Sequence, residues 1–361
     1  MKLPTCIRTR LFTSWALVFA LAAAPAFAQS VRFHQRNLVS DGFIAAEHTD
    51  PNLVNSWGVA FNPFGFVWVA DADAGVSTLY DGNGNVQSLV VAIPSPTAST
   101  GGEPTGIVFN ASTGFVVSKN GVSGPSRFIF ATEQGVIAGW APNVNPTKAI
   151  RAVNNSATGA NYKGLALSAG GNGQLLYATD FFHARIDVFN SAFQPVQLAP
   201  GAFTDPNIPK GFAPFGIQAI GGDIYVTYAK QDASMTDEVV GAGLGYVDVY
   251  TPKGKLIRRV ASRGSLNAPW GIALAPARFG FFSNALLIGN FGDGRINAYE
   301  PVFSFPMGPL RDRHFHPIEI EGLWGIAFGN GFADQPVNTL FFASGPDDEE
   351  HGLYGRLDLI P

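Results

Sequence analysis

The chain has 361 residues, with 23 Lys and Arg against 27 Asp and Glu, and it contains no basic run or stripe. This balance argues against nucleic acid or an anionic membrane as a partner. The one cysteine, Cys6, lies near the start, so disulfides, thiolate metal sites and cysteine nucleophiles are excluded from the rest of the chain. With 42 glycines, 25 prolines and 30 phenylalanines, the composition is typical of an all-β protein with many turns and a large core.

The first 28 residues predict an export signal. Three basic residues are followed by a largely apolar stretch, residues 11–24, and Ala26 and Ala28 make an A-x-A cleavage site. The alternative is a retained membrane anchor, but the apolar stretch is shorter than the ~20 residues that span a bilayer. We therefore expect a mature domain of residues 29–361 that is exported to the periplasm or beyond, without stable membrane insertion.

One short pattern, the template, recurs six times after the signal: usually a turn residue, then a variable residue, a glycine and an apolar run. Successive template glycines are 48 to 58 residues apart, and a period of this length indicates a repeated architecture. The variable residue and the glycine are, in order, Trp57-Gly58, Thr105-Gly106, Lys163-Gly164, Phe215-Gly216, Trp270-Gly271 and Trp324-Gly325.

A second apolar segment follows each template after a turn, and a third strand follows that. Fourth, more polar strands are expected at residues 86–93, 148–153, 195–198, 256–261 and 315–319. Six such units predict an all-β, six-bladed β-propeller whose first strands line the central channel. The sixth unit stops after its third strand, so residues 36–40 are expected to complete this last blade and close the ring.

Several motifs resemble a known group of proteins. The Pro-x-Gly-Ile-Ala strand and the third strand at residues 247–250 resemble six-bladed propellers of the NHL-repeat and gluconolactonase-like type. Residues 228–232, 266–271, 289–294 and 322–325 are similar to an uncharacterised family of exported bacterial six-bladed β-propeller proteins. The resemblance covers nearly all of residues 29–361, and it implies a fold without an established activity.

Polar residues recur just after the second strands, at the end of the channel where propeller loops meet. Oxygen ligands converging from several blades would suit Ca²⁺ or another divalent cation. Gluconolactonase-like propellers bind a divalent ion at this end, and the resemblance implies these candidate ligands: Glu103, Asn161, Asp180, Asn267 and Asn290. The alternative is that Asp and Asn cap turns by bonding their own backbone.

Aromatic residues occupy four of the six variable template positions. These are Trp57, Phe215, Trp270 and Trp324. At the channel mouth they would form a rim for stacking on a sugar or an aromatic ligand, whereas between blades they would be core filler. A lysine, Lys163, occupies a further variable position, and near the axis it needs solvent or a carboxylate partner. Asp180 and Glu103 are the expected partners.

Two functions of different class follow from these patterns. The first is an exported binding module whose channel-end loops hold a small molecule, a glycan or a protein. The second is a divalent-metal-assisted, lactonase-like hydrolase or lyase, with Asp180, His183 or Lys163 handling protons. Common serine, zinc and thiol hydrolase motifs are absent from the sequence. Binding is therefore the preferred hypothesis.

Overall fold

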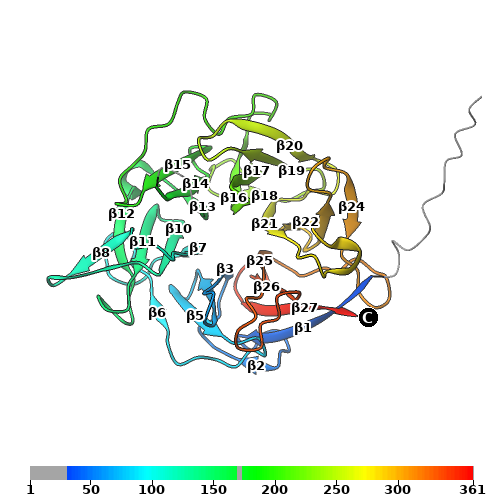
Figure 1. Ribbon diagram of the computed structural model, residues 1–361, viewed down its shortest axis with the longest axis horizontal. Helices are drawn as coiled ribbons and strands as arrows, with labels where there is room; N and C mark the ends of the chain where they lie inside the picture. Colours follow the sequence, from blue (N-terminus) through cyan, green and yellow to red (C-terminus); the bar gives the residue numbers. More distant parts are fainter. Residues whose placement is uncertain (1–30, 169–172, 361) are drawn as a thin grey trace, which may run out of the picture. The chain divides into compact units, whose positions relative to one another are not determined.

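The computed structural model describes residues 31–168 and 173–360, and the predicted export signal lies outside them. Within these stretches nearly every regular element is a β-strand; the helices are two single 3₁₀ turns, η2 (Ser156–Thr158) and η3 (Gly280–Phe282). Neither of these described helices has the length and apolar character that a bilayer crossing requires. Six sheets follow one another around a ring (Figure 1). The predicted six-bladed β-propeller is therefore confirmed.

Four blades contain four antiparallel strands each, in order from the axis outward. Blade 1 is β3 (Ser56–Phe61), β4 (Val67–Asp71), β5 (Val76–Tyr80) and β6 (Val91–Ala92). Blade 2 is β7 (Pro104–Phe109), β10 (Phe128–Thr132), β11 (Val136–Trp140) and β12 (Ile150–Asn154). Blade 4 is β16 (Phe212–Ile220), β17 (Asp223–Gln231), β19 (Gly245–Tyr250) and β20 (Leu256–Ser262), and the short β18 (Glu238–Val239) also pairs with β17. Blade 5 is β21 (Pro269–Leu274), β22 (Leu286–Asn290), β23 (Ile296–Tyr299) and β24 (Pro306–Pro309).

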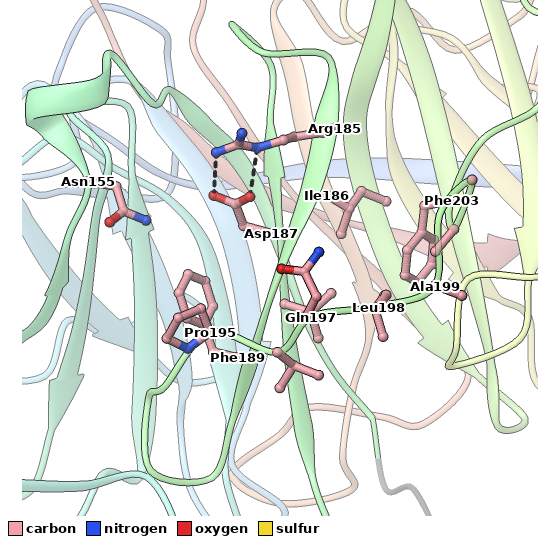
Figure 2. A pocket seen from close by; sticks show the side chains of 14 residues that line it. Asn155, Arg185, Ile186, Asp187, Phe189, Pro195, Gln197, Leu198, Ala199 and Phe203 are labelled. Carbon is pink, nitrogen blue, oxygen red and sulfur yellow. Dashed lines mark hydrogen bonds and ion pairs between the residues drawn. The ribbon is translucent and has the colours of Figure 1, made fainter.

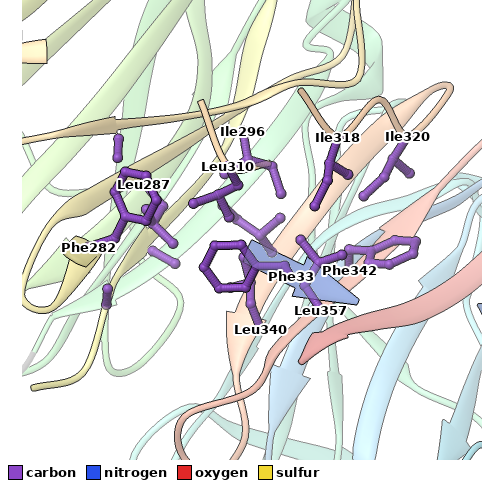
Figure 3. Close-up of a cluster of buried hydrophobic side chains, with 14 of the residues drawn as sticks. Phe33, Phe282, Leu287, Ile296, Leu310, Ile318, Ile320, Leu340, Phe342 and Leu357 are labelled. Carbon is purple, nitrogen blue, oxygen red and sulfur yellow. The ribbon is translucent and has the colours of Figure 1, made fainter. Parts of the chain in front are cut away.

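Blade 6 joins the two ends of the described chain. It contains β25 (Leu323–Phe328), β26 (Leu340–Ser344), β27 (Leu353–Ile360) and β1 (Arg32–Ser40), with the short β2 (His48–Thr49) beyond β1. β1 runs antiparallel to β27 along almost its whole length, so the predicted closing strand is confirmed. Figure 3 shows Phe33 of β1 among the buried side chains between blades 5 and 6, beside Leu340 and Leu357. Ring closure therefore contributes to the core as well as pairing an edge.

Blade 3 differs from the prediction because no fourth strand forms in its described part. Its strands are β13 (Tyr162–Ser168), β14 (Leu175–Asp180) and β15 (Arg185–Asn190). Residues 195–198 are predicted to pair with β15, but only Pro195 bridges it, opposite Phe189. Proline has no N–H to donate to a ladder, and farther on the N–H of Phe203 bonds Gly254 O of blade 4 at 2.7 Å. The chain therefore leaves β15 early.

The outer strand of blade 5 also lies elsewhere than predicted. It is β24, and residues 315–319 contribute only a bridge between Arg311 and Pro317. β24 follows β23 after the short loop 300–305, and a shorter loop loses less entropy on closure. The nearer segment therefore takes the position beside β23.

A hairpin of β8 (Val116–Lys119) and β9 (Val122–Pro125) is inserted between β7 and β10 of blade 2, and the sequence analysis missed it. Asn120 and Gly121 have φ of 51° and 79°, the left-handed values that a two-residue hairpin turn needs. The Asn-Gly pair between two valine-containing runs is the signal in the sequence. β8 lies at the outside of the ring in Figure 1.

The six template glycines are explained by how closely the first strands pack around the axis. A Cβ built on Gly216 would lie 1.9 Å from Trp270 O in the next first strand, and a Cβ on Gly58 would lie 2.5 Å from Thr105 O. A Cβ built on any of the other four template glycines would likewise lie 2.3 to 2.7 Å from a backbone atom of the following first strand. Each glycine therefore lets one inner strand lie directly against the next.

Candidate functional site

The aromatic template side chains meet on the channel axis. Trp57 and Trp324 stack with ring centroids 3.5 Å apart, and Trp270 meets their edges at 5.9 and 5.7 Å. Phe215 lies 5.6 Å from Trp324. Blades 1 and 5, and blades 4 and 6, are not neighbours in the ring, so these contacts occur only because the side chains point inward. They fill the channel instead of separating adjacent blades.

Burial limits what this aromatic cluster offers to a ligand. Trp57, Phe215 and Trp324 are no more than 1% exposed. Trp270 is half-buried and lines a cavity of about 40 Å³ with Gly58, Gly106 and Gly325. The four side chains therefore form a plug beneath the channel end, and their role as ligand contacts stays a prediction.

Lys163 lies at this plug and is 1% exposed. Its ammonium is 5.2 Å from the centroid of the Trp57 ring, and Trp270 Nε1 donates to Lys163 O at 2.9 Å. Its ion-pair partners are Glu133 and Asp237, the latter at 3.1 Å.

The expected pairing of Lys163 with Asp180 or Glu103 is therefore wrong. Asp180 bonds within the turn of its own blade, whereas the Lys163 side chain points inward. There it meets Glu133 from the β10–β11 turn of blade 2.

Two carboxylates pair with this ammonium, those of Glu133 and Asp237, and two more interact with its charge, those of Glu238 and Glu349; we call the four the acidic group. Burial alone would lower the pKa of Lys163, but the carboxylates of Glu133, Glu238 and Asp237 outweigh it and raise the pKa. Burial raises the pKa of Glu238 to about 7, with Lys163 opposing the rise. Close carboxylates cannot all ionise cheaply, so the group carries an excess of negative charge that protons partly neutralise.

Glu349 is the least satisfied member of the acidic group. Burial raises its pKa to about 8, with Glu238 adding to the rise and Lys163 opposing it. Its Oε1 is buried and has no hydrogen-bond partner within residues 31–168 and 173–360. A buried carboxylate without a donor is costly, so a ligand that supplied one would be favoured.

The loop that carries Glu349 is conformationally unusual. Asp347, Asp348 and Glu349 all have positive φ, at 56°, 52° and 72°, a conformation that non-glycine residues rarely adopt in succession. Neighbouring segments hold the loop: Asp347 N donates to Glu321 Oε1 at 3.2 Å, and Asn55 N donates to His351 O at 3.0 Å. Such strain persists only where the surroundings impose it, and it concentrates at ligand sites.

Asp180 and His183 form a second polar group, in blade 3. The carboxylate of Asp180 is fully buried and lies 2.7 Å from His183 Nδ1, and Arg185 approaches it at 3.4 Å. Burial raises the pKa of Asp180, and the hydrogen bond from His183 opposes that rise. No hydrogen bond or ion pair of the described chain joins Lys163 to either residue. The three predicted catalytic candidates are thus divided between two groups.

The predicted metal ligands are mostly engaged with the protein itself. Asp180 accepts from Asn161 N at 3.2 Å, Asn267 Oδ1 accepts from Gly241 N at 2.6 Å, and Asn290 Nδ2 donates to Ser265 O at 2.7 Å. These bonds join segments 19 to 26 residues apart in the chain, so they hold neighbouring loops together instead of capping the residues' own turns. The side-chain oxygens of Asn161 and Asn290 have no donor in the described stretches.

No set of three or more His, Cys, Asp and Glu side chains within those stretches is arranged to hold a metal ion. Glu103 is half-buried, and burial raises its pKa. Binding of Ca²⁺ or another divalent cation stays a prediction.

Part of the acidic group could be found from the sequence. Carboxylates recur after second strands, and Glu133 and the 347–351 segment belong to that pattern. Asp237 and Glu238 lie in the long β17–β19 connection of blade 4, beyond the reach of a local pattern. Only the folded ring brings them to Lys163.

The chain is similar to proteins of Acanthamoeba polyphaga mimivirus that have no described function. One is 35% identical over 329 residues, covering 89% of this chain and 78% of that protein. Another is 32% identical over 325 residues, covering 89% of this chain and 84% of that protein. No family model matches the chain.

Solved structures support the fold. A glucose dehydrogenase superposes with a TM-score of 0.53 at 11% identity, covering 90% of this chain and 99% of that one. A streptogramin B lyase does so with a TM-score of 0.50 at 13% identity, covering 93% and 100%. A Bacteroides thetaiotaomicron protein of unknown function gives a TM-score of 0.54 at 10% identity, covering 90% and 73%. Likeness at these identities concerns the fold alone.

Proposed function

We propose that this chain, which belongs to the same family as the two mimivirus proteins, is a ligand-binding β-propeller whose site lies at the Lys163 end of the channel. The ligand carries a positive charge, as an ammonium or guanidinium group. One observation carries the proposal: two carboxylates pair with one buried ammonium and two more interact with its charge, and Glu349 Oε1 lacks a hydrogen-bond donor in the described stretches. Residues 1–28 direct the protein to the periplasm or the exterior.

The physical reason is charge compensation. A ligand cation would supply the donor that Glu349 lacks and would offset the repulsion within the acidic group. Because burial holds protons on Glu238 and Glu349 near neutral pH, with their pKa raised to about 7 and about 8, cation binding must release protons. The affinity should therefore rise with pH through this range.

The test is isothermal titration calorimetry with spermidine and arginine as probes, at pH 6.0 and pH 8.5, in two buffers of different ionisation enthalpy. We expect tighter binding at the higher pH, proton release near neutral pH, and at least tenfold weaker binding for Glu349→Gln. The matched control is Glu47→Gln, which removes a half-exposed carboxylate paired with Arg36 on the outer edge of blade 6. Absence of binding by both probes, or equal loss in the two variants, would reject the proposal.

A second candidate function follows from the Asp180–His183 pair. The buried carboxylate of Asp180 bonds His183 Nδ1 and leaves Nε2 available for a substrate, on a side chain that is 28% exposed. A carboxylate orients a histidine general base in this way. This favours the metal-assisted hydrolase or lyase as the alternative, with His183 moving the proton. Hydrolysis of lactone probes by the purified protein, lost in His183→Ala, would support it over binding alone.

A further inference from the structure

Blade 3 has an open edge where most other blades place a well-formed fourth strand. Strands β12, β20, β24 and β1 occupy this position in blades 2, 4, 5 and 6, and the short β6 occupies it in blade 1. Beside β15 the structure instead has a groove of about 460 Å³ between that strand and residues 195–203 (Figure 2). A volume of this size is typical of ligand pockets.

The backbone along this groove is ready to pair with another strand. Asn190 N donates to Gln194 O, and Val188 O accepts from Val196 N at 2.8 Å, so these residues direct their backbone groups away from β14. Inward and outward groups alternate along an antiparallel strand, and β15 pairs with β14 without a bulge. The N–H and C=O of Ile186 therefore face the groove, and no described residue bonds them.

The two faces of β15 present different side chains to the groove. On one face, Arg185 Nε donates to Asp187 Oδ1 at 2.8 Å, and Asn155 lies on the same side (Figure 2). The other face is apolar, with Ile186 near Leu198 and Phe203. A strand laid along β15 would direct alternate side chains to these two faces.

We propose that the outer edge of β15 binds an extended peptide, which completes blade 3 as its fourth strand. One peptide side chain is apolar and packs on Leu198 and Phe203, and its neighbour is a hydrogen-bond donor directed to Asp187. Strand addition of this kind takes affinity from the main-chain bonds and specificity from the alternate side chains.

The occupant is a peptide because the free groups of the edge are backbone donors and acceptors at strand spacing. Buried or half-buried backbone groups normally have partners, and in the other blades a strand supplies them. Two such groups of the described edge are open, both on Ile186, so a short peptide segment is sufficient. The Lys163 end belongs to a separate site, which lets the two proposals be tested independently.

The experiment begins with a phage-displayed library of random octapeptides, selected on the full chain. A selected peptide is then synthesised twice, unmodified and with N-methyl groups on the residues that would donate to β15, and binding is followed by fluorescence anisotropy. We expect the N-methylated peptide to bind at least tenfold more weakly, since methylation removes the main-chain donors and leaves the side chains. We also expect the unmodified peptide to slow hydrogen exchange at the Ile186 amide.

Protein variants complete the test. Ile186→Pro removes one outward N–H while the inward bonds of Arg185 and Asp187 to β14 remain, and it should abolish binding. Lys210→Ala, at an exposed residue outside the groove, should leave it unchanged. The proposal is overturned if no octapeptide is selected, if the N-methylated peptide binds equally well, or if a folded Ile186→Pro protein retains the affinity.

Discussion

Replacement of Gly216 by alanine tests whether the close approach of the first strands is the reason for the template glycine. The new Cβ would lie 1.9 Å from Trp270 O and 2.9 Å from Thr227 Oγ1. Ordinary contacts begin near 3.4 Å, so two closely packed inner strands would have to separate by more than an ångström. Overpacking in a close-packed interior typically costs about 1–3 kcal/mol. Because the obstacle is a backbone carbonyl, which cannot rotate away as a side chain can, we expect a loss of stability at the upper end of this range.

The assay is thermal and urea unfolding of Gly216→Ala beside two other glycine variants. A loss of about 3 kcal/mol should lower the Tm by roughly 4 °C for a chain of this size. Gly271→Ala, whose Cβ would lie 2.6 Å from Trp324 O, should lose less. Gly221→Ala is the control, because its φ is 62° and nothing lies within 4 Å, so it should lose only the ~1 kcal/mol of a left-handed alanine. Equal losses in Gly216→Ala and Gly221→Ala would refute the packing argument.

Three further predictions concern charge, metal and ring closure. Burial raises the pKa of Glu349 to about 8 from 4.5, so the folded protein holds a proton that the unfolded chain releases. The stability contribution is full below pH 4.5 and falls by up to about 1.4 kcal/mol per pH unit toward pH 8; Glu349→Gln should flatten this slope in urea titrations, and an unchanged slope would contradict the assignment. Under the metal-assisted alternative, Ca²⁺ should raise the Tm of the wild type but not of Asn290→Ala, and no shift in the wild type retires that alternative. Deletion of residues 31–40 exposes the partners of Phe33 and Leu38, which are buried, and should cost roughly 5 kcal/mol; an unchanged unfolding midpoint would show that β1 is dispensable.

Local patterns are enough to predict the repeat and most of its strands. The apolar template with its glycine returns at a regular spacing, and every copy forms a first strand. The predictions of outer strands fail where two segments of the chain could pair with the same third strand or where a segment has an alternative partner. Residues 195–198 do not form a strand because Pro195 has no N–H to donate and because Phe203, farther on, bonds Gly254 of blade 4. Residues 315–319 do not pair with β23 because the nearer β24 does.

The candidate site is less accessible to sequence reasoning. Lys163 is conspicuous in the sequence because aromatic residues occupy most of the equivalent positions. Its predicted partners, Asp180 and Glu103, nevertheless do not pair with it. Glu133 is 30 residues away and Asp237 is 74 residues away. Neither separation carries a periodic signal, because the two carboxylates reach the lysine from different blades.

The number of blades, the innermost strand of each and the closure of the ring all follow from patterns along the chain. These features depend on short-range chemistry: strand propensity, turn residues, and a glycine wherever two backbones touch. The folded ring is needed to see that the template tryptophans plug the channel, that Lys163 lies within the acidic group, and that blade 3 keeps an open edge. Each of these features depends on groups that are distant in the sequence and close in space. Burial and electrostatic interactions depend on distance in space and not on separation along the chain.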